Sequence, residues 1–273
     1  MIQTADMPHS LARRIACIRV ATILVTVAAW ELISRSGLLF EGVVPSTLVV
    51  AKAIGSELAD PGFYRDLAFT MLASIVGFAC GSVIAVAGGI GLGSNSFLRR
   101  MIEPYILALG STPKIIFLPI LFLVFGLGIE SKMAKGALSA FFPVILSTTS
   151  GFIQIPPILL RVGRSMHLTG PQMIGKIYLP AMINPLLTGL RLGMAMAIIG
   201  VLSAEISYSN AGLGFRLIRD ADQFKIASVY ALAILIFATA ALINFAFTKA
   251  QEHFASHTSR RRAEAPSRLR LWP

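Results

Sequence analysis

Long runs without charged residues dominate this chain. Residues 67–98, 136–160 and 226–248 contain no Asp, Glu, Lys or Arg. A bilayer core about 30 Å thick requires about 20 apolar residues of helix, because a helix rises 1.5 Å per residue. Three shorter windows reach that length if one flanking charged side chain extends to the membrane interface. The pattern therefore predicts six membrane-spanning helices, at 16–34, 69–92, 106–128, 133–152, 186–206 and 227–248.

The composition supports this prediction. Of 273 residues, 55% are hydrophobic and 14% are charged, whereas a soluble domain has about 25% charged residues. So little charge cannot cover a surface in water, and the excess of apolar residues also excludes a disordered chain. We expect an all-α, polytopic helix bundle that forms a single transmembrane domain over 1–273, with a core at about 65–250. The two cysteines, Cys17 and Cys80, form no disulfide framework.

The basic residues predict an orientation, since cytoplasmic loops carry an excess of Lys and Arg. The chain has a net charge of +11. With the N-terminus inside, the cytoplasmic segments hold fourteen basic and four acidic residues, and the external segments, to which Lys132 and Lys135 are assigned, hold eight of each. We therefore expect a cytoplasmic N-terminus at 1–14 and a basic cytoplasmic tail at 250–273. Five tail arginines beside a membrane fit this bias or anionic lipid better than nucleic acid.

Enzyme chemistry finds little support in the sequence. The four histidines follow no zinc-binding pattern. Residues 170–176 spell G-x-x-x-x-G-K, but Ile177 replaces the Ser or Thr that would hold magnesium and no predicted strand precedes the motif. We expect no catalytic residues, metal or cofactor in this chain. Any energy for transport would have to come from an ion gradient or from another subunit.

Ionisable residues inside a membrane are costly, so they are functional candidates. Lys114 and Arg191 lie close to the predicted cytoplasmic side, where they can extend to the interface. Glu205 lies at the external end of the fifth predicted span, with no basic residue within helical reach. It faces a translocation path, or it makes a structural hydrogen bond or lies at the interface. The sequence leaves these open, and Lys114 is a second, weaker candidate for the path.

Small residues predict close helix packing in the second span. Gly77 and Gly81 have the G-x-x-x-G spacing, and a glycine-rich run follows at 88–93. A different pattern marks residues 153–185, where five prolines punctuate a basic, partly apolar segment. It predicts a short helix, a turn and another short helix, and a loop of this length is commonly functional.

This loop resembles the coupling segment of the membrane-spanning subunit of binding-protein-dependent ABC importers. That family carries Glu-Ala-Ala, three residues, Gly, nine residues, an aliphatic residue, any residue and Leu-Pro. Ile177-Tyr178-Leu179-Pro180 matches its end, which places Glu-Ala-Ala on 161–163 and the Gly on His167. Gly170 reaches the glycine position only if three residues are deleted.

The resemblance extends from about Pro45 to the last span. The motifs Pro45-Ser46-Thr47, Pro113-Lys114-Ile115, Leu118-Pro119, Phe125-Gly126-Leu127-Gly128, Ser131-Lys132, Phe141-Phe142-Pro143, Gly189-Leu190-Arg191-Leu192, Ala204-Glu205 and Gly212-Leu213-Gly214 occur in this order. As a set they resemble the branch that serves sulfonates, taurine, nitrate and related small solutes.

The resemblance implies a type I, MetI-like fold in the cell membrane of a prokaryote. It also implies three partners: a separate cytoplasmic ATP-binding subunit, an extracytoplasmic solute-binding protein, and a second permease subunit, expected to be an identical copy. The loop would contact the ATPase through Arg161, Arg164, His167, Gly170, Ile177, Leu179 and Pro180.

The alternative is a gradient-driven secondary transporter. Such a protein should show acidic or histidine relays in mid-membrane and, often, inverted repeats. Neither feature is visible in the sequence.

Overall fold

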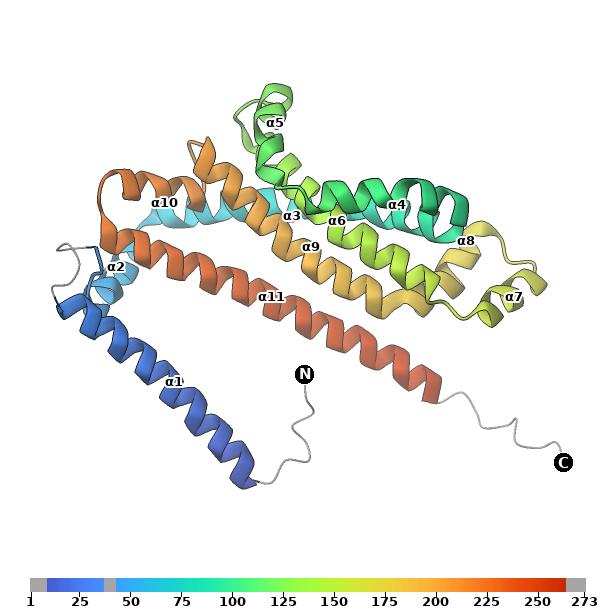
Figure 1. Ribbon diagram of the computed structural model, residues 1–273, viewed down its shortest axis with the longest axis horizontal. Helices are drawn as coiled ribbons and strands as arrows, with labels where there is room; N and C mark the ends of the chain where they lie inside the picture. The colour runs from blue at the N-terminus through green and yellow to red at the C-terminus, as the bar shows by residue number, and fades with distance from the viewer. Residues whose placement is uncertain (1–8, 37–42, 264–273) are drawn as a thin grey trace. The chain divides into compact units, whose positions relative to one another are not determined.

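The computed structural model describes residues 9–36 and 43–263. Residues 1–8 and 264–273, which include parts of the predicted N-terminal segment and basic tail, lie outside the described residues. The described elements are all helical (Figure 1). They are α1 (His9–Arg35), α2 (Thr47–Ala59), α3 (Pro61–Ser94), α4 (Ser96–Ser111), η2 (Lys114–Phe117), α5 (Leu118–Phe125), α6 (Ile129–Ile153), α7 (Pro157–Ser165), α8 (Gly170–Met173), η3 (Ile174–Tyr178), α9 (Leu179–Ser207), α10 (Leu213–Asp222) and α11 (Ile226–Ala263).

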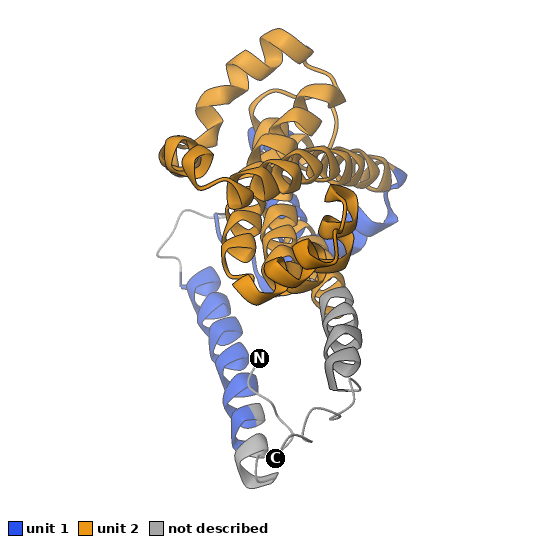
Figure 2. Cartoon of the chain, turned by 90° about the vertical axis from the view of Figure 1, so that its right-hand side faces the viewer, with its two compact units in different colours: residues 1–61, 217–235 blue, residues 62–216, 236–273 orange. Residues whose placement is uncertain are grey.

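The chain forms two compact units (Figure 2). Unit 1 comprises Met1–Pro61 and Leu217–Leu235, and unit 2 comprises Gly62–Arg216 and Ile236–Pro273. Within unit 1, the Trp30 indole N–H of α1 donates to the Pro45 carbonyl at 3.0 Å, and the Trp30 ring meets that of Tyr230 edge-on at 5.1 Å. The first contact holds the end of α1 against the segment that leads into α2, and the second holds it against the start of α11.

Unit 2 is built on α3 and α6, which run in the same direction. A Cβ atom on Gly77 would lie 2.5 Å from the Met133 carbonyl oxygen, and one on Gly93 would lie 2.5 Å from the Phe152 Cβ. Residues further along α3 therefore face residues further along α6. Gly81 would overlap the Ala137 backbone if it carried a Cβ. The predicted packing role of Gly77 and Gly81 is confirmed.

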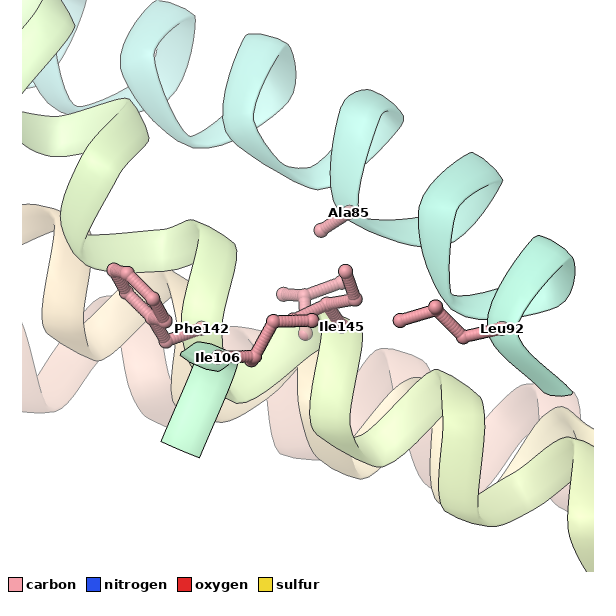
Figure 3. Packing of buried hydrophobic residues seen from close by; sticks show 6 residues of the cluster. Ala85, Leu92, Ile106, Phe142 and Ile145 are labelled. Carbon is pink, nitrogen blue, oxygen red and sulfur yellow. The ribbon is translucent and has the colours of Figure 1, made fainter. Parts of the chain in front are cut away.

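The glycine-rich run continues the same interface. A Cβ on Gly89 would lie 2.6 Å from the Thr148 Cβ. Figure 3 shows the apolar cluster beside it, where Ala85 and Leu92 of α3 lie against Ile145 of α6. Ile106 of α4 and Phe142 and Val144 of α6 complete the cluster. Because side chains here are small or absent on one helix, the two backbones approach closely and van der Waals contact holds them together.

The second helix pair of unit 2, α6 and α9, runs in opposite directions. Gly136 of α6 lies near Val201 of α9, whereas Gly151, near the end of α6, lies near Pro185, near the start of α9. Figure 1 shows α3, α6 and α9 side by side along much of their length. We call the two ends of unit 2 the α7 end, where α6 leads into α7, and the α10 end, where α9 leads into α10.

The prediction of an unbroken third span at 106–128 is wrong. The chain bends by 94° between Ser96–Ser111 and Lys114–Phe125. The cause is Pro113: proline lacks the backbone N–H that a helix needs, and it drives the residue before it out of the helical region. Thr112 accordingly has φ −67° and ψ 138°.

This bent pair still crosses unit 2. It joins the end of α3 to the start of α6, and because α3 and α6 are parallel these two points lie at opposite ends of the unit. Together with α1, α3, α6, the helix at Gly170–Ser207 and α11, the described helices supply up to six spans.

Two other expectations need correction. The fifth span does not start at residue 186, because Gly170–Ser207 is helical throughout and 38 residues long. A π-helical turn at Ile174–Tyr178 precedes Pro180, and such a turn re-forms the hydrogen-bond pattern where proline lacks an N–H. Lys132 and Lys135 are not loop residues. Both lie in α6 with side chains 0% and 2% exposed.

Candidate coupling and translocation site

The segment between α6 and α9 contains α7, and a tight turn ends that helix. His167 has φ +51°, its N–H donates to the Arg164 carbonyl at 3.0 Å, and the Leu168 N–H donates to the Gly163 carbonyl at 3.2 Å. These two hydrogen bonds, together with the left-handed conformation of His167, form the Schellman motif that commonly ends helices. Glycine is the usual residue at that position.

The turn decides the register of the family pattern. Counting back from Ile177 places the pattern's glycine on His167, and His167 is the residue with a positive φ. The positive-φ glycines of the described chain are Gly126 and Gly212, so Gly170 does not take the left-handed conformation. The structure therefore favours the register without a deletion. Histidine tolerates a left-handed conformation better than most residues do, although less well than glycine.

An exposed apolar ridge runs along α7. Ile158, Val162 and Met166 are 57%, 46% and 67% exposed. Their spacing of four residues places them on one face. Arg161 and Arg164 are also exposed. The sequence prediction named the arginines but not the ridge, although its four-residue spacing was a readable signal.

The opposite face of α7 packs on the start of the long helix at Gly170–Ser207. Gly163 is buried, and a Cβ there would lie 2.6 Å from both the Ile177 Cδ1 and the Met173 Sδ atoms. Of the other predicted contact residues, Ile177 and Leu179 are half-buried, whereas His167, Gly170 and Pro180 are exposed. The predicted residues thus divide between an outer surface and the packing that supports it.

A polar groove lies at the α7 end between α6 and α9. It has a volume of about 650 Å³, and its polar lining comes from Ser147, Ser150, Gln154, Asn184 and Thr188. Hydroxyl and amide side chains placed together on two membrane helices mark a surface that can meet water or a polar solute. Sequence reasoning had not identified these residues, because none of them is ionisable.

The α10 end holds a buried carboxylate. Glu205 is 0% exposed, and its carboxylate accepts hydrogen bonds from Thr70 Oγ1 of α3, at 2.8 and 3.0 Å, and from the Gly214 N–H of α10, at 2.9 Å. Thr70 Oγ1 in turn accepts from the Leu213 N–H at 2.9 Å. Of the two interpretations of Glu205, the structure supports a structural hydrogen bond: the side chain joins α3, α9 and the first turn of α10.

The connection into α10 is built around this carboxylate. Gly212 has φ +103°, and its N–H donates to Asp66 Oδ1 at 3.0 Å. A Cβ on Gly212 would overlap the Glu205 carboxylate, and one on Gly214 would lie 2.8 Å from the Glu205 Cβ. Asp66 also lies 3.5 Å from Arg216. Glycine is required at 212 by both conformation and space. Glu205 accepts from one of the backbone N–H groups that the first turn of α10 leaves without a helical partner.

A family model described as the binding-protein-dependent transport system inner membrane component matches residues 77–260. This range includes the bent pair, α7 and the whole of α9. The chain belongs to this family. It is the permease subunit of a prokaryotic ABC importer, an integral membrane protein whose family works with an ATP-binding subunit and a solute-binding protein.

The relatives place the permease in the sulfonate, taurine and nitrate branch. It is 28% identical to the putative aliphatic sulfonates transport permease protein SsuC of Bacillus subtilis, over 84% of this chain and 82% of that one. It is 23% identical to the taurine transport system permease protein TauC of Escherichia coli, with 85% and 86% covered. It is 28% identical to the nitrate import permease protein NrtB of Synechocystis, with 64% of each chain covered.

A solved structure confirms the predicted fold. A chain of the MetNI methionine ABC transporter, solved in inward-facing conformations, superimposes with a TM-score of 0.60 at 18% sequence identity. The match covers 76% of this chain and 96% of that one. The MetI-like, type I permease fold predicted from the sequence is thus confirmed.

Proposed function

We propose that this permease imports a small solute of the sulfonate, taurine and nitrate class, and that α7 couples it to a separate ATPase. In this proposal two identical permease chains form the pathway, a solute-binding protein delivers substrate from outside, and both termini are cytoplasmic. The sulfonate, taurine and nitrate transport functions of the relatives support the substrate class. The observation that carries the coupling role is the α7 ridge of Ile158, Val162 and Met166.

The ridge has the form of a helix that binds in a groove. Apolar side chains at four-residue spacing on one helix face are the usual anchors of such an interface. The exposed Arg161 and Arg164 beside them suit a partner with an acidic rim, which would guide docking. On the membrane side, the buried Gly163 lets α7 pack without a gap on Met173 and Ile177, so a displacement of α7 moves the start of the long helix.

The long helix can carry that displacement across the membrane. Its 38 residues span about 57 Å, which exceeds the hydrocarbon core of about 30 Å. It lines the polar groove near one end through Asn184 and Thr188, and it is fixed at the other end by Glu205. The long helix thus contacts α7 at one end and the Glu205 hydrogen-bond partners at the other, and it lines the polar groove. An alternating-access cycle needs such an element, which transmits a displacement from one side of the membrane to the solute path.

The coupling role is tested with Val162→Glu. A charge in the centre of the ridge should prevent burial against the ATPase, because an unpaired buried carboxylate is strongly unfavourable. We expect the purified permease to lose ATPase co-purification and ATP-driven uptake of labelled taurine or nitrate into proteoliposomes, while its membrane insertion is unchanged. Ser96→Glu, an exposed first residue of α4 where a negative charge is favourable, is the matched control. Normal coupled transport by Val162→Glu would refute the role of α7.

A further inference from the structure

The polar groove at the α7 end lies where α6 and α9 touch. A Cβ on Gly189 of α9 would lie 2.5 Å from the Ser147 Cβ, and one on Gly151 of α6 would lie 2.9 Å from the Pro185 Cβ. Because these glycines have no side chains, the two backbones approach closely. The residues beside the two contacts line one shared groove of about 650 Å³. Sites for small molecules have volumes of about 300–1,000 Å³.

Four side chains in the lining of this groove have hydrogen-bond donors to spare. The hydroxyls of Ser147 and Ser150 and the amides of Gln154 and Asn184 donate to none of the described residues. Hydroxyls on other helices of the chain commonly donate to a carbonyl one turn earlier, as that of Thr248 does at 2.8 Å. The groove therefore brings together unused donors from two helices.

The donors of the groove are also uncharged. No charged side chain of the described chain lines it. Lys114, the weaker candidate for the translocation path, is half-buried in the bent pair, where its Nζ donates to the Gly110 carbonyl at 2.7 Å. Thr188 lines the groove, but its hydroxyl already donates to the Asn184 carbonyl at 3.0 Å. It can therefore offer a solute only acceptor lone pairs.

We propose that Ser147, Ser150, Gln154 and Asn184 bind the oxyanion headgroup of the transported solute, a sulfonate or nitrate, through these neutral donors. Sulfonate and nitrate oxygens accept hydrogen bonds, and a bond to a charged acceptor is about twice as strong as one between neutral groups. Side-chain donors of Asn, Gln and Ser stabilise negative oxygens in the same way in the oxyanion holes of enzymes. The inference rests on the proposed importer function and names the residues that would recognise its substrate.

The position of these donors links the site to α7. Asn184 lies on the long helix whose start packs on α7, whereas Ser147 and Ser150 lie on α6. A displacement of α7 that moves the long helix along α6 would separate Asn184 from the two serines. Hydrogen bonds weaken steeply when their geometry is lost. The site would therefore hold the headgroup in one state and release it in the other, as alternating access requires.

Direct binding tests the proposal. The permease in complex with its ATPase, in nanodiscs and without the binding protein, is melted with sodium ethanesulfonate, with sodium nitrate, or with the neutral ethyl methyl sulfone, at constant ionic strength set by sodium gluconate. A ligand that binds the folded state raises the melting temperature. We expect at least one of the two anions to do so in a saturable way, at a lower concentration than the sulfone, whose oxygens are weaker acceptors. No shift with either anion, or half-saturation by the sulfone at the same concentration, would overturn the proposal.

Variants on the two helices assign the binding to the groove. Asn184→Leu keeps the size of the side chain but removes its amide, and should raise the half-saturating anion concentration about tenfold or more. Ser150→Ala removes one hydroxyl and should raise it about fivefold. The matched control is Ser94→Ala, at an exposed serine whose hydroxyl donates within α3, and it should bind like the unmodified chain. An unchanged concentration in either Asn184→Leu or Ser150→Ala would overturn the proposal.

Thr188→Val tests whether donors, rather than general polarity, hold the anion. The Thr188 hydroxyl has no donor to spare, so this variant should raise the half-saturating concentration less than Ser150→Ala does. An effect as large as that of Ser150→Ala would contradict the assignment to neutral donors.

A second copy of the chain is the other partner that such a surface could meet, because Ser, Asn and Gln also hydrogen-bond between membrane helices. Native mass spectrometry of Asn184→Leu distinguishes the two. We expect the variant to keep the subunit composition of the unmodified complex, and loss of a permease subunit would assign the groove to a subunit contact instead.

The same preparations also test the importer function separately. ATP hydrolysis stimulated by the liganded binding protein, without anion binding in the absence of that protein, would overturn the groove site alone. Anion binding without any stimulated ATP hydrolysis would overturn the importer function alone.

Discussion

At the scale of single residues, the buried Glu205 links three helices at the α10 end. Its carboxylate accepts from Thr70, which lies 135 residues earlier in the chain, and from the first turn of α10. Gly212 and Gly214 leave the space that this side chain fills. Such a network stabilises one arrangement because every partner is satisfied, and removing one leaves another unpaired in a buried site.

Glu205→Gln tests this role. Replacing one acceptor oxygen with an NH₂ group sets a donor against the Thr70 hydroxyl or the Gly214 N–H, so we expect a loss of about 2 kcal/mol in stability. The measurement is the melting temperature of the purified permease. A double-mutant cycle with Thr70→Val should show coupling of about 1 kcal/mol. An unchanged melting temperature with impaired transport would instead place Glu205 on the translocation path.

At the scale of helices, the arrangement of unit 2 follows from where glycine permits contact. Gly77, Gly81, Gly89 and Gly93 of α3 meet successive turns of α6, so the two helices are parallel and close. In a membrane, where lipid is as apolar as leucine, such close approach supplies attraction that burial of apolar surface cannot. The parallel direction in turn requires the bent pair to return the chain across unit 2.

Two glycines of α3 offer a matched test of this packing. Gly81→Ala places a methyl group against the Ala137 backbone, which cannot yield as a flexible side chain can. We expect a loss of about 1–3 kcal/mol, seen as faster thermal inactivation of the detergent-solubilised permease. Gly91→Ala meets no atom within 4 Å and should be neutral or stabilising by up to about 1 kcal/mol. Equal stability of the two variants would contradict the close α3–α6 contact.

At the scale of the whole molecule, the number of membrane crossings and the distribution of basic residues both predict that the two termini lie on the same side of the membrane. The bent pair counts as one broken span, which brings the candidate spans to six. An even number returns the chain to the side on which it started, and fourteen of the basic residues fall on the segments that this arrangement assigns to that side. The positive-inside tendency then predicts that this side is the cytoplasm.

Reporter fusions test this orientation. Green fluorescent protein fused after residue 273 should fluoresce, and alkaline phosphatase fused there should be inactive, because the first folds in the cytoplasm and the second only outside it. Fusions after Asn210, in the predicted external connection, should give the reverse pattern. The same pattern at both positions would contradict the predicted topology.

The sequence by itself determined that the chain crosses a membrane, roughly where, and to which family it belongs. These conclusions depend on local features: charge-free runs, small residues at helical spacing, and motifs whose order along the chain is visible. The Ile177 to Pro180 match placed the pattern's glycine on His167. That His167 ends α7 in a left-handed turn was seen only in the structure.

Tertiary structure alone decided the rest. Nothing near Glu205 in the sequence indicates that Thr70 would reach it, and the charges of Lys132 and Lys135 suggested a loop, although both side chains are buried in α6. The bend at Pro113 does not by itself show that the bent pair crosses the membrane. That conclusion follows only from the parallel direction of α3 and α6, which the structure supplies. Hydropathy reports how much of a segment is apolar, but which charge is buried, and against which partner, depends on contacts between helices far apart in the chain.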